Sequence, residues 1–196
     1  MDERLIITDG DVDTATVAAY ERSRRELVRR GLLAAGTLLT ASSVPILLGV
    51  RDAFAQADDD QSLVRAAIEL EQVAAEAYQR LQGPLGGVAR LFRNHERQHE
   101  QALTLALRQM GGSTPSANVQ ARLASLPTGD RRAAARFAIE LEQTAVRAYE
   151  DAARKLRDAS LMKTTSTILG AEAQHLVVLR QIAGQDPVPA AFERGS

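Results

Sequence analysis

The chain has 196 residues, no cysteine and an almost balanced charge, with 24 Lys and Arg residues against 25 Asp and Glu residues. The absence of cysteine excludes disulfides, thiolate zinc sites, iron–sulfur clusters and a lipoprotein anchor. The near-neutral charge, with no basic patch interleaved with aromatic residues, gives no indication of nucleic-acid binding.

Residues 1–57 are typical of an export signal. A polar start leads to Arg24 and Arg25, and an apolar stretch over 31–50 precedes small residues that suit cleavage near Ala57. The arginine pair resembles the twin-arginine signal, which predicts passage through the twin-arginine export machinery into the periplasm or extracellular space of a bacterium. The apolar stretch is about long enough to cross a bilayer, so an uncleaved signal that anchors the protein in a membrane is the alternative.

Residues 58–184 are predicted to form one all-α domain, since they suffice for a core and show helical periodicity. We expect four helices, over about 61–82, 88–110, 131–157 and 161–183. Glycine and proline breakers separate them. Short links join the first to the second and the third to the fourth, which predicts an antiparallel four-helix bundle. The longer link over 113–130, with a short helix expected over 119–126, is then the crossover between the two halves.

The tail, residues 185–196, holds two prolines and is expected to be extended. We expect it to lie along the bundle with Phe192 in an apolar groove. No fifth amphipathic helix follows the fourth, and the expected assembly is a monomer or a homodimer.

The predicted helices carry one pattern twice. In each copy a glutamate lies in an apolar helical segment, a tyrosine follows it seven residues later, and the next helix holds a Glu-x-x-His pair. The chain has three histidines, and two of them fall in corresponding places of the two copies, which argues against chance. The repeated residues are, in chain order, Glu71, Tyr78, Glu96, His99, Glu142, Tyr149, Glu172 and His175.

The spacing predicts which of these side chains share a helix face. A helix advances about 100° per residue, so residues three, four or seven apart lie on one face. Each Glu-x-x-His pair can therefore present an oxygen and a nitrogen to one point. Glu69 and Glu140 lie about 200° around from the neighbouring glutamates and are expected to face outward.

The apolar surroundings of Glu71 and Glu142 indicate burial, and a buried carboxylate without a partner costs several kcal/mol or becomes neutral. Bound cations would neutralise these carboxylates. Carboxylate and imidazole ligands favour iron or manganese over a thiolate-seeking metal. The alternative is a buried network without metal, in which glutamates pair with protonated histidine or with arginine.

The pattern resembles the ferritin-like superfamily of carboxylate-bridged di-iron proteins, over about residues 60–184. The resemblance implies that Glu71 and Glu142 each bind one ion, that Glu96 and Glu172 bridge two ions, and that His99 and His175 complete the two coordination spheres. It also implies that Tyr78 and Tyr149 hydrogen-bond to ligand carboxylates and orient them.

His95-Glu96-Arg97-Gln98-His99 also matches the zinc metalloprotease motif H-E-x-x-H. That interpretation leaves the second copy unexplained, because Ala171 occupies the place that corresponds to His95. We therefore expect His95 to pack beside the metal site or to support it.

The expected function is that of an exported metal-binding protein with two iron ions, or manganese as the alternative, which oxidises ferrous iron or removes peroxide. Its expected partners are the metal ions and dioxygen or peroxide. The alternatives are a non-catalytic metal-buffering or structural domain, a dimanganese catalase and, least favoured, the zinc metalloprotease.

Overall fold

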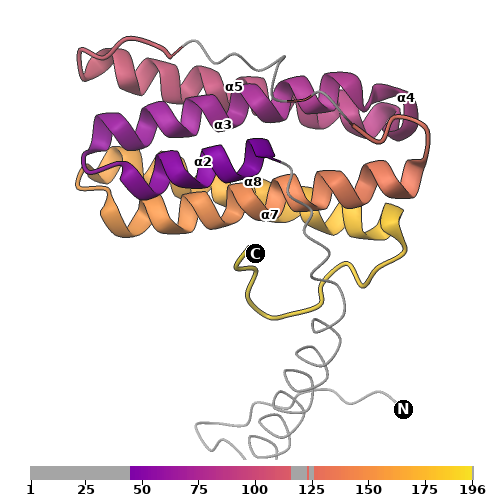
Figure 1. The fold of residues 1–196 in the computed structure, drawn as a ribbon. Helices are drawn as coiled ribbons and strands as arrows, with labels where there is room; N and C mark the ends of the chain where they lie inside the picture. Colours follow the sequence, from indigo (N-terminus) through magenta and orange to yellow (C-terminus); the bar gives the residue numbers. More distant parts are fainter. Residues whose placement is uncertain (1–44, 116–122, 124–125, 196) are drawn as a thin grey trace, which may run out of the picture. The chain divides into compact units, whose positions relative to one another are not determined.

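The chain is all-α over residues 45–115, 123 and 126–195, which are the residues that the structure, a computed structural model, describes. Within these ranges there are six helices and no strands (Figure 1). The helices are α2 (Pro45–Gln56), α3 (Asp60–Arg80), α4 (Gln82–Leu85), α5 (Gly87–Gln109), α7 (Arg131–Lys155) and α8 (Ala159–Ala183).

Aspartates set the starts of three of the long helices. The carboxylates of Asp59, Asp130 and Asp158 accept hydrogen bonds from backbone N–H groups in the first turns of α3, α7 and α8. Such caps satisfy N–H groups that have no partner inside the helix. At the other end of α8, Gly184 takes a left-handed conformation with φ of 73°, which glycine adopts without steric cost.

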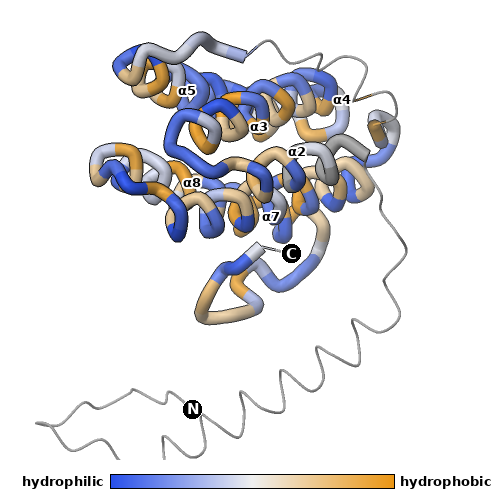
Figure 2. The backbone as a smooth tube through the Cα atoms, turned by 60° about the vertical axis from the view of Figure 1, so that its left-hand side comes forward, coloured by the Kyte–Doolittle hydropathy of each residue, from blue (hydrophilic) through white to orange (hydrophobic). Residues whose placement is uncertain are grey.

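The four long helices form two packed pairs. α3 packs mainly against α5, and α7 packs mainly against α8, while α3–α7 and α5–α8 contacts join the pairs (Figure 1). Hydrophobic and hydrophilic residues alternate around the turns of these helices, as expected for helices with one buried face (Figure 2).

The buried apolar residues form two clusters along the helices. One contains Leu81, Phe92, Ile139 and Leu179, and the other contains Leu63, Leu103, Ala152 and Ile168, among others. On each long helix, the buried glutamate of the repeated pattern lies between residues of the first cluster and residues of the second. The polar residues of the pattern are therefore enclosed by apolar packing along the helices.

The short helix α2 packs on α3 and α7 (Figure 1). Phe54 and Ala57 are buried, and the Phe54 ring meets the Tyr149 ring edge-on at a centroid distance of 6.4 Å. The Lys155 ammonium donates to the carbonyls of Phe54, Ala55 and Ala57 at 2.8, 3.1 and 3.2 Å. Most of the predicted export signal, residues 1–44, lies outside the described residues. In the part that the structure describes, no helix is both long and apolar enough to cross a membrane.

The four predicted long helices are present, with ends within a few residues of the expected ones. The first predicted helix ends at Arg80, close to the expected end, and Gly83 and Pro84 lie inside the separate short helix α4. Pro84 is tolerated there because it lies in the first helical turn, where its missing N–H would have no partner in the helix. The predicted helix over 119–126 lies mostly outside the described residues.

The tail beyond α8 contains no helix up to residue 195, as predicted, but the expected burial of Phe192 is wrong. Its side chain is 73% exposed. Polar contacts hold the tail instead: the buried Arg180 pairs with Glu193 at 2.6 and 3.1 Å. Gly195 lies so close to the α7 backbone at Gln143 and Arg147 that a Cβ atom there would clash. These anchors leave Phe192 facing solvent.

Candidate metal centre

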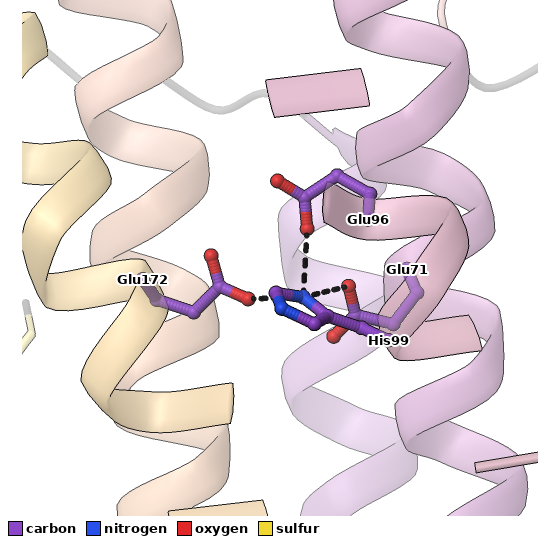
Figure 3. Close-up of side chains that lie close together, drawn as sticks. All are labelled: Glu71, Glu96, His99 and Glu172. Atoms are coloured by element: carbon purple, nitrogen blue, oxygen red, sulfur yellow. Dashed lines mark ion pairs between the residues drawn. The ribbon is translucent and has the colours of Figure 1, made fainter. Parts of the chain in front are cut away.

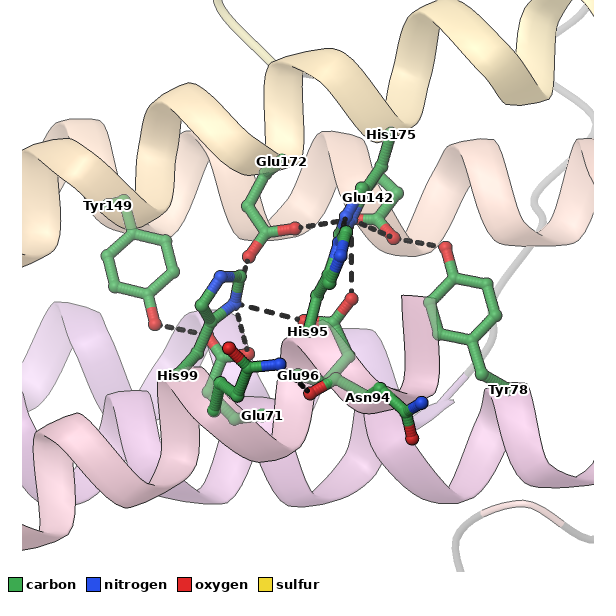
Figure 4. A network of polar contacts seen from close by, with 11 residues as sticks. Glu71, Tyr78, Asn94, His95, Glu96, His99, Glu142, Tyr149, Glu172 and His175 are labelled. Carbon is green, nitrogen blue, oxygen red and sulfur yellow. Dashed lines mark hydrogen bonds and ion pairs between the residues drawn. The ribbon is translucent and has the colours of Figure 1, made fainter. Parts of the chain in front are cut away.

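The side chains of the repeated pattern meet in the interior of the described domain (Figure 4). α3 and α7 each contribute one glutamate, and α5 and α8 each contribute a glutamate and a histidine. These six residues are Glu71, Glu96, His99, Glu142, Glu172 and His175. Glu69 and Glu140, expected to face outward, are only partly buried and lie outside the group.

The first set of ligand atoms, here called the His99 group, consists of Glu71, Glu96, His99 and Glu172 (Figure 3). His99 Nδ1 lies 3.1 Å from Glu172 Oε1, 3.3 Å from Glu96 Oε2 and 3.4 Å from Glu71 Oε2. All ligand atoms of the group lie within 4.8 Å of one another. One cation can therefore contact side chains from three helices.

The second set, here called the His175 group, consists of Glu96, Glu142, Glu172 and His175. His175 Nδ1 lies 3.0 Å from Glu172 Oε2, 3.3 Å from Glu96 Oε1 and 3.4 Å from Glu142 Oε1. Glu96 and Glu172 thus turn one oxygen toward each histidine. Two carboxylates shared in this way are able to join two ions.

Many of the polar atoms at the centre are buried and lack hydrogen bonds. Although the nitrogens and oxygens lie at ion-pair distances, six of these atoms have no hydrogen-bond partner. An unsatisfied buried polar atom costs about 1–3 kcal/mol, so six together call for a ligand. The orphaned atoms are Glu71 Oε2, Glu96 Oε1, His99 Nδ1, Glu172 Oε1, Glu172 Oε2 and His175 Nδ1. This donor set, oxygen-rich with imidazole, fits iron or manganese.

The carboxylates titrate abnormally in the metal-free site. Burial raises the pKa of Glu142 to about 7, and the nearby charge of Glu172 adds to the rise while His175 opposes it. Burial likewise raises the pKa of Glu71 well above its usual range, with His99 opposing the rise. Without a cation, the site therefore holds protons on groups that are ordinarily ionised at neutral pH.

The histidines bind protons tightly when no metal is present. Burial lowers the pKa of His99, but the carboxylates of Glu172, Glu71 and Glu96 outweigh this effect and raise it to about 12. The same balance between burial and three carboxylates raises the pKa of His175 to about 12. Because histidine binds metal in its neutral form, a metal ion would have to displace these protons.

The two tyrosines hydrogen-bond across the halves of the domain (Figure 4). Tyr78, on the same helix as Glu71, donates to Glu142, while Tyr149, on the same helix as Glu142, donates to Glu71. Both rings are fully buried, and burial together with the facing carboxylate raises the pKa of each hydroxyl, so both stay protonated donors. Glu71 and Glu142 are therefore each oriented by a tyrosine from the other half of the repeat.

His95 contacts the site from outside. Its Nδ1 lies 2.9 Å from Nε2 of His175, on the side of that ring away from the carboxylates, and it belongs to neither candidate group (Figure 4). Burial and the positive charge of His175 lower the pKa of His95. The H-E-x-x-H interpretation requires His95 and His99 on one ion, and this arrangement does not support it.

Phe92 also belongs to the site, although it was not among the predicted site residues. Its ring stacks on His175 at a centroid distance of 3.9 Å and an angle of 23°, and it also meets Tyr78 edge-on. The helical spacing of Phe92, His95 and His99 places them along one side of α5. This spacing in the sequence indicates that Phe92 lies on the same side of α5 as the two histidines.

Comparison with known families adds an independent observation. A model of the ferritin-like domain matches residues 79–185, more than half of the chain. The chain belongs to the ferritin-like family. The match includes five of the six acidic and imidazole residues of the site, while Glu71 and Tyr78 precede it. None of the curated proteins and none of the solved structures compared with the chain matches it.

The ferritin-like assignment agrees with the fold, which is helical and holds a cluster of glutamates and histidines that can bind metal. Glu71 lies outside the matched residues, yet it faces His99 as Glu142 faces His175. Glu71 thus occupies on α3 the place that Glu142 occupies on α7.

Proposed function

We propose that this ferritin-like domain holds two metal ions, most suitably iron, in an antiparallel four-helix bundle with a long crossover between α5 and α7. Glu71 and Glu142 would each hold one ion, Glu96 and Glu172 would serve both ions, and His99 and His175 would each supply one nitrogen. The observation that carries the proposal is the set of six buried donor atoms without hydrogen bonds around two adjacent points.

The formal charge of the site supports bound cations over a metal-free network. Four carboxylates face two imidazoles, so even two protonated histidines leave an excess of negative charge. No arginine or lysine within the described ranges forms an ion pair with these glutamates. Two divalent ions would neutralise the carboxylates without requiring the glutamates to be protonated.

The proposed chemistry is oxidation of ferrous iron or removal of peroxide. Two redox-active ions, when bound, would supply electrons to dioxygen or peroxide at one place. The protein's own contribution is to hold the ligands: the tyrosines fix the two terminal carboxylates, and the apolar clusters limit the access of water. A non-catalytic iron buffer would use the same residues, and the bound metal would distinguish the iron protein from a dimanganese catalase.

The first test is elemental analysis of protein expressed with iron and with manganese. We expect two ions per chain, and we expect Glu96→Ala and Glu172→Ala to lose both because each of these residues serves both groups. Glu69→Ala, which changes a partly buried glutamate on α3 outside the groups, is the matched control and should keep both ions. A wild-type protein without bound metal would refute the proposal.

A second measurement separates enzyme from buffer. The iron-loaded protein should consume dioxygen or peroxide faster than the same amount of free ferrous iron does. If it binds two ions but is no faster than free iron, the buffering function stands and the enzymatic one fails.

We also propose export through the twin-arginine pathway, on the basis of Arg24 and Arg25 and the apolar stretch that follows. Replacing both arginines by lysine should leave the protein in the cytoplasmic fraction. The burial of Phe54 favours retention of α2, because cleavage after Ala57 would remove this ring from the core. Sequencing the amino terminus of the exported protein distinguishes the cleaved form from the retained, anchored form.

A further inference from the structure

Among the side chains that can bind a metal ion or hydrogen-bond at the site, the two halves match except at one position. His95 lies four residues before His99, whereas Ala171 lies four residues before His175. The glutamates, histidines and tyrosines of the two halves correspond in type and in contacts. If the two groups differ in metal affinity, the His95 imidazole, which the second half lacks, is the first cause to consider.

His95 supports only the His175 group. Its Nδ1 lies 2.9 Å from Nε2 of His175, and the two rings are inclined by only 15°. If the Nδ1 lone pair of His175 binds a cation, the ring proton must be on Nε2, and this N–H can donate to His95 Nδ1. Phe92 covers one face of the same ring. This hydrogen bond would hold His175 in the orientation and tautomer that metal binding requires.

His99 has no such support. Within the described ranges, its only polar partners are the carboxylates of Glu71, Glu96 and Glu172. Its side chain is 14% exposed, against 3% for His175. The methyl group of Ala171 cannot accept a hydrogen bond from a ring N–H. A cation in the His99 group would therefore have to fix the orientation of the His99 ring without help from a second imidazole. It would also lie closer to solvent.

We propose that the two ion positions are inequivalent and that His95 is the positioning residue that makes them so. The His175 group binds the first ion tightly, and the His99 group binds the second ion more weakly and exchanges it. The inference rests on the proposed dinuclear site.

The test is a titration of the metal-free full chain with Co²⁺, followed by visible absorption and calorimetry. The wild-type protein should bind two ions in two steps of different affinity. His95→Ala should weaken the first step about 10- to 100-fold, the usual effect of losing the partner of a metal-binding histidine, and should leave the second step unchanged. His95→Asn should largely restore the first step, because its amide oxygen can accept the same hydrogen bond.

Two further variants assign the steps. Glu142 belongs only to the His175 group and Glu71 only to the His99 group, so Glu142→Ala should remove the tight step and Glu71→Ala the weak one. Thermal unfolding of the metal-free proteins checks that His95→Ala, at a partly exposed position, remains folded.

The outcomes separate the inference from the proposed function. Failure of the wild-type protein to bind Co²⁺ would refute the proposed dinuclear site itself. Two ions bound with equal affinity, equal weakening of both steps by His95→Ala, or no restoration by His95→Asn would overturn the role of His95 while the dinuclear site stands.

Discussion

At the scale of single residues, the site depends on side chains that meet across the repeat. Tyr78 and Tyr149 each share a helix with one of the two glutamates, Glu71 or Glu142, but donate the hydroxyl hydrogen bond to the other. The ring of each tyrosine is packed in the core and the hydroxyl reaches the carboxylate. Replacing a tyrosine by phenylalanine therefore removes one hydrogen bond to one carboxylate with little change in packing.

We predict that Tyr78→Phe lowers the affinity of the His175 group for its ion about 10-fold or more, because the Tyr78 hydroxyl donates to Glu142. The affinity of the His99 group should not change. Tyr149→Phe should do the reverse, so each variant serves as the control of the other. Stepwise metal titration measures both effects. In double-mutant cycles, Tyr78→Phe should couple with Glu142→Gln and not with Glu71→Gln. Coupling to Glu71, the residue on the same helix, would contradict the crossed arrangement.

At the scale of helices, α2 is an integral part of the described domain. Its Phe54 side chain lies in the cluster that includes Tyr149, and Lys155 of α7 donates to three carbonyls at the end of α2. These contacts satisfy carbonyls that the helix end leaves without partners. α2 therefore supports the helix that carries Glu142 and Tyr149.

We predict that Phe54→Ala lowers the free energy of unfolding by about 3 kcal/mol, the usual effect of deleting a buried phenylalanine ring. Phe192→Ala, which removes a ring that is 73% exposed, is the matched control and should change stability by less than about 0.5 kcal/mol. Urea unfolding of the metal-free full chain measures both. Equal effects would show that α2 is not packed as described.

At the scale of the whole molecule, metal binding and proton binding compete. Glu142, with a pKa of about 7, and the two histidines, with pKa values of about 12, bind protons more tightly in the folded metal-free protein than in the unfolded chain. The metal-free protein should therefore lose stability as the pH rises from about 4.5 through 7 and above. Metal ions need the same groups without protons, so metal affinity should increase over this range.

We predict that saturating Mn²⁺ raises the melting temperature of the metal-free protein more at about pH 8 than at about pH 5.5. An ion at 100 times its dissociation constant adds about 2.7 kcal/mol, which corresponds to several degrees for a domain of this size. Glu96→Ala, which lacks a ligand of both groups, should show no shift at either pH. An equal shift at both values would contradict proton displacement.

Much of this arrangement is predictable from the sequence, because the information is local. Helical periodicity and glycine breakers predict the long helices, and the duplicated spacing predicts that Glu71 and the two Glu-x-x-His pairs face one interior. The crossed tyrosines and the His95–His175 contact depend on how separate helices are placed, which periodicity does not specify. The exposure of Phe192 was mispredicted because contacts of Arg180 and Gly195 decide how the tail lies.

The central claim is that six acidic and imidazole side chains hold two ions side by side. Anomalous diffraction at the iron absorption edge, from crystals grown with ferrous iron in the absence of oxygen, tests it most directly. We predict two peaks, one enclosed by the His99 group and one by the His175 group, with Glu96 and Glu172 contacting both. No peak among these residues, or only one, would contradict the account.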